Sequence, residues 1–465
     1  MFLRTGLAVG FVAALAASGP AWAESRTLTE ALATAYSNNP SLQAARAQLR
    51  SVDENVPQAL AGWRPQVSLS GNAGYNDLYT KEKSKLSGTT TTSNVLGTYT
   101  GQLVVTQPVW RGGQTRAGTN KAESQVMGQR ARLIAAEVQV FGDTVSAFVS
   151  VISNQQVLTL NINNEQVLAR QLQATNDRFR VGEITRTDVA QAEAALAGAT
   201  ATRQIAEGNL QTARAQFQRV VGELPGALIE PQPLRLPAHT LQEAKALAAN
   251  NNPNVVAALF DDAAAKDNFD LQYSKLMPNV SIQGSLANSK DVSIPDYQTR
   301  SAEIVAAVTI PIYQGGSEYA AIRQARQQQQ QSRKLVDDAR RTAVQQVISA
   351  WETYDASKSA IESTRSQIRA NGIALEGVER EAIVGSRTTL DVLNAEQLLL
   401  NSRVTQVQNL SNLVNASYAV AAAAGRLTAR DLSLPVPLYD ETAYYNAVRD
   451  RWIGTGDYAT SQPGR

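Results

Sequence analysis

The chain has 465 residues, and its 43 lysines and arginines nearly balance 41 aspartates and glutamates, giving a formal net charge of +2 at pH 7. Such a balance provides no electrostatic case for binding nucleic acid. The absence of cysteine excludes a disulfide framework, a thiol nucleophile and a cysteine-linked lipid anchor. The single histidine, His239, has no clustered ligands or nucleophile beside it, so we expect no metal site, no cofactor and no catalysis.

The first residues have the layout of a secretory signal peptide. Arg4 precedes an apolar run over residues 7–17, and Ala21 and Ala23 form a cleavage-site pattern. We therefore assign residues 1–23 to a signal peptide and expect an exported protein. Beyond it no run of about 18 apolar residues is evident, so we expect no membrane-spanning helix.

The remaining chain contains one pattern twice. V-G-E-I-T-R-T-D-V-A-Q-A-E at 181–193 returns as V-G-S-R-T-T-L-D-V-L-N-A-E at 384–396, and N-N-P occurs at 38–40 and again at 251–253. The two copies of each pattern are roughly 200 residues apart, and so long a period indicates a duplicated half rather than a short solenoid repeat. The domain division that we predict is a first repeat over 24–222, a proline-rich connection over 223–239, a second repeat over 240–428 and a tail over 429–465.

Each repeat is predicted to begin with a helix pair and to continue as a β-hairpin. The proline of N-N-P suits the first turn of the second helix of each pair. After it, apolar or small residues alternate with polar ones, as in a strand with one apolar and one polar face. We place the hairpins at 65–107, with a polar loop over 80–93, and at 278–312, with a polar loop over 289–298.

The two hairpins end in matched phrases, P-V-W-R-G-G and P-I-Y-Q-G-G. Proline cannot donate to a sheet ladder, the aromatic residue suits a membrane boundary, and paired glycines permit a sharp turn into a helix. The predicted strand-to-helix junctions are therefore Pro108, Gly112 and Gly113 in the first repeat, and Pro311, Gly315 and Gly316 in the second.

A long helical hairpin is predicted after each junction, over 114–222 and 317–425. The first arm of each is free of proline and would extend roughly 100 Å at 1.5 Å per residue. The second arm begins within the duplicated pattern. The tail at 429–465 shows no period, which leaves open a docked segment or disorder.

Four strands cannot close a barrel, and open strand edges cannot be placed in lipid. Three copies would supply twelve strands, so we predict a trimeric membrane barrel continued by helices. The alternative is a structural periplasmic coiled-coil or adhesion protein without a pore, since charged and glutamine-rich helical runs are usually solvated faces. That alternative leaves the apolar strand faces unburied.

The two-fold repeat, the P-[VI]-[WY]-x-G-G junctions and V-G-S-R-T-T-L-D-V-L-N-A-E resemble the TolC family of outer-membrane factors over essentially the whole mature chain. The resemblance implies the non-lipidated branch: a homotrimer with a twelve-stranded transmembrane β-barrel, four strands per chain, continued by a long periplasmic α-helical barrel. It implies an exit duct in the outer membrane for efflux or type I secretion. The partners would be a periplasmic adaptor, an inner-membrane transporter of RND or ABC type, and outer-membrane lipid.

The resemblance also implies a constriction and a latch where the duplicated pattern starts the second helix arms. Asp391 and Asn394 lie three residues apart on one helix face, and threefold symmetry would repeat them as a ring. The family has two aspartates there, so Asn394 lowers the acidic charge of this ring and its block by multivalent cations.

The latch of the family corresponds here to Arg387 bonding Thr187 and Asp188, without the family's assisting tyrosine, which aligns with Ala382. From the residues alone, the two Thr-x-x-Asp patterns are equally consistent with capping boxes at helix starts. Arg387 could equally be a surface charge, and Asn394 an ordinary polar helix position.

Overall fold

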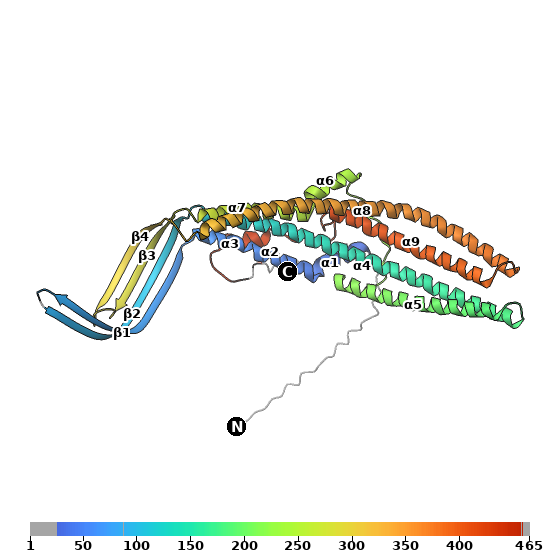
Figure 1. The fold of residues 1–465 in the computed structure, drawn as a ribbon, viewed down its shortest axis with the longest axis horizontal. Coiled ribbons are helices and arrows are strands. Elements are labelled where there is room, and N and C mark those ends of the chain that lie inside the picture. The colour runs from blue at the N-terminus through green and yellow to red at the C-terminus, as the bar shows by residue number, and fades with distance from the viewer. Residues whose placement is uncertain (1–25, 87, 457, 459–465) are drawn as a thin grey trace, which may run out of the picture. The chain divides into compact units, whose positions relative to one another are not determined.

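The computed structural model describes residues 26–86, 88–456 and 458 (Figure 1), so the expected signal peptide at 1–23 lies outside the described residues. In chain order the elements are α1 (Leu28–Asn38), α2 (Pro40–Asp53), α3 (Asn55–Leu60), the 3₁₀ turn η1 (Ala61–Trp63), β1 (Gln66–Ser84), β2 (Gly88–Trp110), α4 (Gln114–Arg180), α5 (Arg186–Val221), α6 (Leu241–Asn251), α7 (Pro253–Ser274), β3 (Asn279–Lys290), β4 (Gln298–Thr309), α8 (Ser317–Ile383), α9 (Thr389–Ala423) and α10 (Ala443–Val448).

The chain divides into two compact units, and each unit takes segments from both sequence repeats. Unit 1 contains Thr144–Gln232, Thr364–Ser411 and the described residues up to Thr34. Unit 2 contains Ala35–Asp143, Pro233–Ser363 and the described residues from Asn412 onward. We retain the predicted division by repeat, 24–222 and 240–428, as a proposal about how the chain is built from two similar halves.

Unit 2 contains one four-stranded sheet in the order β1-β2-β3-β4. All three pairings are antiparallel, and Leu103 lies between Leu69 on β1 and Leu286 on β3, which in turn pairs with Ala302 on β4. β1 and β4 each have one neighbour, so the sheet has two unpaired edges within the chain.

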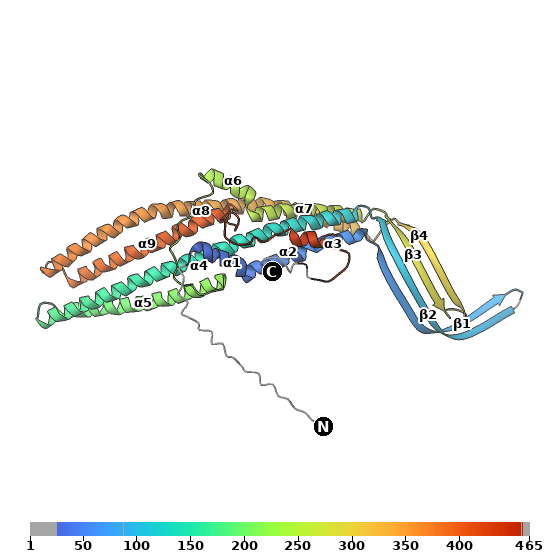
Figure 2. The same ribbon diagram turned by 180° about the vertical axis from the view of Figure 1, so that it is seen from behind.

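The β1–β2 hairpin is longer than the sequence predicted. β1 continues to Ser84 and β2 begins at Gly88, so most of the segment 80–93, predicted as a polar loop, is strand. That prediction was wrong because the threonines at 89–92 favour a strand while hiding the apolar alternation. β3 pairs with β2 only from Tyr99, which leaves residues 74–84 and 88–98 as a two-stranded extension (Figures 1 and 2), the projecting ribbon.

The first strand-to-helix junction depends on a glycine in a left-handed conformation. β2 passes through Pro108 with a register irregularity against β3, consistent with the missing N–H of proline. Gly112 and Gly113 follow with φ of 58° and 86°. A Cβ on Gly112 would lie 2.2 Å from the Met277 Cβ, whereas Gly315, at φ 68° in the second junction after Pro311, has no atom within 4 Å of such a Cβ.

The duplicated N-N-P phrase forms the same helix start twice in unit 2. Asn39 and Asn252 are the N-caps of α2 and α7, and their side chains accept from the amides of Ser41 (3.0 Å) and Asn254 (2.9 Å). Proline occupies the first turn of each helix, where its missing N–H costs no hydrogen bond. These local bonds explain why the broken helix pairs could be predicted.

The described part of the tail is docked on unit 2. The Tyr439 amide donates to the Tyr36 hydroxyl at 3.0 Å, the Tyr444 hydroxyl donates to Glu54 at 2.8 Å, and Arg449 pairs with Glu123 at 3.3 Å. Of the two alternatives that the sequence left open, docking is the one that the residues up to 456 adopt.

One finding differs from the expectation that no helix could cross a membrane. By length and composition alone α4 qualifies, and 44% of its apolar window is buried inside the protein. A helix packed in a protein core passes the same test, so this window is weak evidence for a membrane span. The sequence reading overlooked it because small polar residues interrupt the apolar ones.

Replacing Gly112 by alanine should destabilise the protein by about 3 kcal/mol, because the left-handed conformation and the contact with Met277 both oppose a Cβ. The matched control, Gly315→Ala, has the strain without the contact and should cost about 1 kcal/mol. Denaturant unfolding of the purified proteins measures both. Equal losses would show that the contact with Met277 is relieved at no cost.

Candidate functional site: the hairpin turns and the polar sheet face

The first copy of the duplicated pattern forms the turn between α4 and α5, in unit 1. Gly182 adopts φ 82°, and its amide donates to the Phe179 carbonyl at 2.9 Å while the Glu183 amide reaches the Arg178 carbonyl at 3.0 Å. This arrangement ends α4 by satisfying its last carbonyls. Thr185 then caps α5.

The second copy forms an equivalent turn between α8 and α9. Gly385 also has φ 82°, and the amides of Gly385 and Ser386 donate to the carbonyls of Ala382 (3.3 Å) and Glu381 (3.0 Å). The Thr388 amide donates to the Asp391 carboxylate at 3.0 Å, and the Asp391 amide donates back to the Thr388 hydroxyl at 3.2 Å. The same sequence pattern therefore produces the same backbone twice.

Both aspartates of the pattern are helix caps. Asp188 accepts from the Thr185 amide at 3.0 Å and from its hydroxyl at 2.7 Å, a full capping box. The hydroxyl bond first, and then the amide bond, lower the pKa of Asp188 below its ordinary value of 3.8. The pKa of Asp391 is lowered by its bonds from the Thr388 amide and hydroxyl. A lowered pKa means that these caps are at full strength above pH 3.8 and are lost as the pH falls through the lowered values.

Each turn has one ion pair, and the positions of the positive and the negative side chain are exchanged between the two turns. In the first, Arg178 on the helix pairs with Glu183 in the turn at 2.8 Å; in the second, Glu381 on the helix pairs with Arg387 in the turn at 2.9 Å. The bond to Glu381 raises the pKa of Arg387. Arg387 is about half exposed, so this pair is readily exchanged for another partner.

The structure of one chain does not bring the predicted latch residues together. Among the described residues, Arg387 bonds Glu381 and Asp188 bonds Thr185, while Thr187 is exposed at the start of α5. The sequence reading missed Glu381, which lies six residues before Arg387 across the turn. A charge of opposite sign on the other side of a glycine turn was the available signal.

The predicted constriction residues lie on the first turns of α9. Asp391 is half-buried by its cap, and Asn394 is exposed. Between them Leu393 is buried against Leu168 of α4 and Ala199 of α5. This cluster fixes which face of α9 packs inward in unit 1 and leaves Asn394 on an open face.

Polar bonds between helix arms hold each hairpin of unit 1 together. Glu165 on α4 accepts from Thr200 at 2.7 Å and pairs with Arg203 at 2.7 Å, both on α5. On the other hairpin, Asn409 donates to Thr364 at 3.0 Å and Asn371 donates to the Leu398 carbonyl at 3.2 Å. Sequence reasoning missed these residues because each partner is more than 25 positions away.

The sheet of unit 2 has one polar face. Alternate residues on all four strands are Ser, Thr, Asn or Gln with a few apolar residues among them, and the only charged side chains of the described strands on this face are Glu82 and Glu303. The opposite face carries exposed apolar side chains such as Leu69 and Ile304. A sheet with faces of this kind separates lipid from water.

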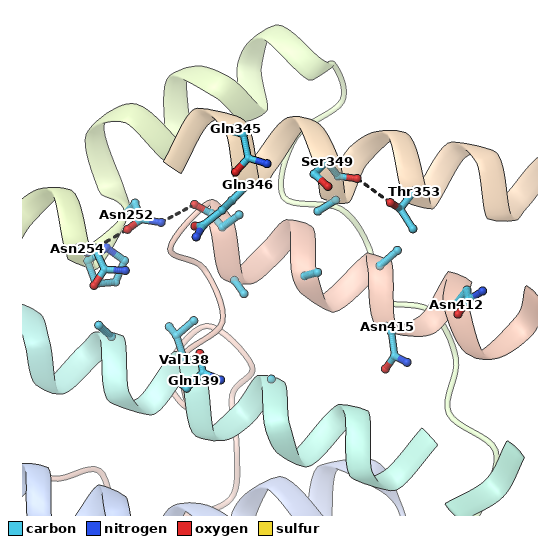
Figure 3. Close-up of a pocket in the computed structure, with 18 residues that line it drawn as sticks. Val138, Gln139, Asn252, Asn254, Gln345, Gln346, Ser349, Thr353, Asn412 and Asn415 are labelled. Atoms are coloured by element: carbon cyan, nitrogen blue, oxygen red, sulfur yellow. Dashed lines mark hydrogen bonds between the residues drawn. The ribbon is translucent and has the colours of Figure 1, made fainter. Parts of the chain in front are cut away.

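Unit 2 also contains a polar cavity of about 620 Å³ between α4, α8 and α9, next to the start of α7 (Figure 3). Amide and hydroxyl side chains line it with alanines, and none of its described lining residues is charged. Asn252 closes one side by donating to the Ala423 carbonyl at 3.0 Å. Such a lining suits a wetted wall better than a selective binding site.

Comparison with known proteins gives the class. The family model described as "Outer membrane efflux protein" matches residues 31–223 and 245–426, most of the chain and in two parts. Outer membrane efflux protein BepC of Brucella suis is 36% identical over 431 residues, which cover 92% of each chain. Outer membrane protein TolC of Escherichia coli is 24% identical and aligns over 95% of this chain and 92% of its own.

The solved structure of the outer membrane protein VceC from Vibrio cholerae shares the fold, with a TM-score of 0.74 and 20% identity over 86% of this chain and 96% of that one. The chain belongs to the outer membrane efflux protein family, the TolC family of outer-membrane channels. It is an outer-membrane efflux or secretion channel, and the predicted fold class is confirmed: a trimeric twelve-stranded barrel with four strands per chain, continued by helices.

Removing the cap of α9 should loosen the second turn. In Thr388→Val the Thr388 hydroxyl is lost, and with it the bond that it accepts from the Asp391 amide and the bond that it donates to the Asp391 carboxylate. The Asp391 amide keeps only its bond to the Thr388 carbonyl, so amide exchange in the first turn of α9 should become about fivefold faster. The control Thr405→Val removes a hydroxyl that only donates to the Asn401 carbonyl within the same helix, and should leave that turn unchanged. Hydrogen-exchange mass spectrometry compares them, and equal exchange in both variants would contradict a structural role for the cap.

Proposed function

We propose that the chain forms the exit duct of a tripartite efflux or type I secretion assembly. Three copies would conduct substrates passively from the periplasm to the exterior. An inner-membrane transporter of RND or ABC type would select the cargo, and a periplasmic adaptor would join the two. The Brucella relative is an outer membrane efflux protein, and this favours the efflux route.

The observation that carries this proposal is the sheet with unlike faces and unpaired edges. In lipid every backbone N–H and C=O must be paired, so β1 and β4 require partners from other chains. Joining β4 of one copy to β1 of the next closes a ring whose polar face is turned inward. Within the four-stranded part of the described sheet, Glu303 is the only charged side chain on that inner face, which would favour cationic and neutral cargo over anions.

Passive conduction requires no chemistry from the chain. Among the described residues no group of three or more His, Asp or Glu side chains could hold a metal ion. The expectation that the chain is not an enzyme rests on its family, whose members are channels. We propose that the energy for transport comes from the transporter.

We propose that the hairpin turns gate the duct at its periplasmic end. Arg387 pairs with the exposed Glu381, and breaking an exposed ion pair of this kind costs little free energy. Thr187 is exposed and Asp188 keeps a charged carboxylate at neutral pH, so both can accept from the Arg387 of a neighbouring chain. Asp391 and Asn394 would form the ring on the axis. Binding of an adaptor would exchange these bonds and open the ring.

The basic test is conductance of the purified trimer in planar bilayers. A folded trimer that inserts and conducts supports the duct. A folded trimer without any conductance, even when Arg387 is replaced, would contradict it and favour a protein without a pore.

For the latch, Arg387→Ala and Thr187→Val should each raise the single-channel conductance, because either removes the proposed bond between chains. Thr187→Val leaves the capping box of Thr185 and Asp188 intact and so separates latch from cap, whereas Asp188→Ala removes both. The control is Arg180→Ala, which removes an exposed arginine that pairs with Asp177 close to the turn between α4 and α5. Conductance that matches the control in all variants would return Arg387 to a surface role.

For the ring, Asn394→Asp should make the conductance more sensitive to block by divalent cations, since threefold symmetry would add three carboxylates near the three of Asp391. The control Asn176→Asp makes the same change on α4, outside both copies of the duplicated pattern. A concentration series of Mg²⁺ on both variants measures the effect. Equal block would remove Asn394 from the constriction.

A further inference from the structure

The apolar face of the sheet ends in basic side chains. Residues of alternate positions share this face, which the pairing register carries across all four strands. Its exposed aliphatic members are Val67, Leu69, Val95, Val105, Ile282, Leu286, Ile304 and Val308. At the end away from the strand-to-helix junctions the same face carries Lys81, Lys83, Lys290 and Arg300.

These four cations lie at two levels. Lys290 pairs across the sheet with Tyr99, and Arg300 pairs with Asn288, two residues beyond Leu286. This near pair therefore lies at the end of the apolar stripe on β3 and β4, whereas on β2 the exposed Val95 lies further out on the same face. Lys81 is opposite Thr91, eight residues before Tyr99 on β2, so the far pair of Lys81 and Lys83 is about 26 Å further along the projecting ribbon.

Tyrosines on the same face lie beside both pairs of cations: Tyr99 is level with Lys290, and Tyr79 is two residues before Lys81. Tyr75, Tyr79 and Tyr99 are on the same face and are 89%, 65% and 59% exposed. Tyrosine is typical of the interface between hydrocarbon and headgroups, where its ring is in lipid and its hydroxyl in water. Tyr99 and Tyr75, which are nearest to Lys290, therefore place the near pair at headgroup depth, and the far pair is further out on the projecting ribbon.

Charge is segregated between the two faces of the sheet. The apolar face has four bases and one acid, Asp77, on its described strands, whereas the polar face has only the acids Glu82 and Glu303. Lys290 has one acidic neighbour, Asp291, at 3.9 Å, and stays more than half exposed. Cations gathered on the lipid-facing side indicate an anionic ligand in the membrane rather than in the lumen.

We propose that this face binds the phosphorylated glycolipid of the outer leaflet, lipopolysaccharide, at two depths. The near pair, Lys290 and Arg300, would bind the phosphates of the acylated sugars, and the far pair, Lys81 and Lys83, the phosphates of the core oligosaccharide. A glycerophospholipid has its phosphate at a single depth and could not occupy both pairs. The proposal depends on the outer-membrane location and not on the gate.

The test uses the full-length trimer with three probes: diphosphoryl lipid A, the same lipid without phosphates, and lipopolysaccharide with a phosphorylated core. Native mass spectrometry counts the bound molecules. Wild type should retain both phosphorylated probes and release the dephosphorylated one. Equal retention of phosphorylated and dephosphorylated lipid A would overturn the proposal, as would displacement of the lipids by millimolar inorganic phosphate.

Two double variants separate the levels. Lys290→Gln with Arg300→Gln should weaken binding of both phosphorylated probes about tenfold, whereas Lys81→Gln with Lys83→Gln should weaken only lipopolysaccharide by that factor. All four side chains are exposed, so folding is preserved, and unchanged bilayer conductance verifies it.

The control variant, Lys266→Gln with Lys275→Gln, removes two exposed cations from α7 and the residue after it, and should bind like wild type. Double variants that bind like this control would overturn the proposal. Because conductance is measured on the same samples, failure of lipid binding with an intact pore leaves the duct proposal unaffected.

Discussion

The hydrogen-bonding requirement of the two outermost strands constrains the whole molecule. A strand edge carries a row of N–H and C=O groups, and in hydrocarbon each unpaired group costs several kcal/mol. One chain satisfies only the inner edges, at β1-β2, β2-β3 and β3-β4. The chain therefore depends on its copies for the remaining bonds, and the polar lumen follows from the same closure because the apolar face must turn toward lipid.

Duplication explains how one chain supplies this architecture, and small departures from it explain how the halves differ. The two turns have the same glycine conformation and the same Thr-to-Asp cap. The ion pair beside each cap is reversed, since Arg178 faces Glu183 while Glu381 faces Arg387. Opposite charges in otherwise equal turns would attract if neighbouring chains brought them together, and this asymmetry supports the latch that we propose. The projecting ribbon is a second asymmetry, because the other hairpin ends near Lys290.

Much of the fold was accessible from sequence because its signals are local. Period-two alternation marked the strands, N-N-P marked α2 and α7, and V-G-x-x-T marked the ends of α4 and α8. The outer part of the ribbon was missed because residues 80–84 and the four threonines at 89–92 are all polar and show no apolar alternation. Asn409 with Thr364, and Glu381 with Arg387, escaped because their pairing depends on how two helix arms align. The division into two compact units also followed no sequence boundary, since α4 and α8 each contribute to both. For the candidate site, the caps were foreseen, whereas the latch and ring involve neighbouring chains and stay predictions.

The central claim is that β4 of one chain pairs with β1 of the next, and the natural absence of cysteine makes it directly measurable. Each variant carries one cysteine on β1 and one on β4, both at residues of the polar face. Oxidation in membranes should link β4 of one chain to β1 of the next at one register and give a covalent trimer on denaturing gels. Cysteine pairs shifted by two residues from that register should link weakly. Uniform absence of linkage along both strands, in protein that is folded and inserted, would contradict closure of the barrel through these edges.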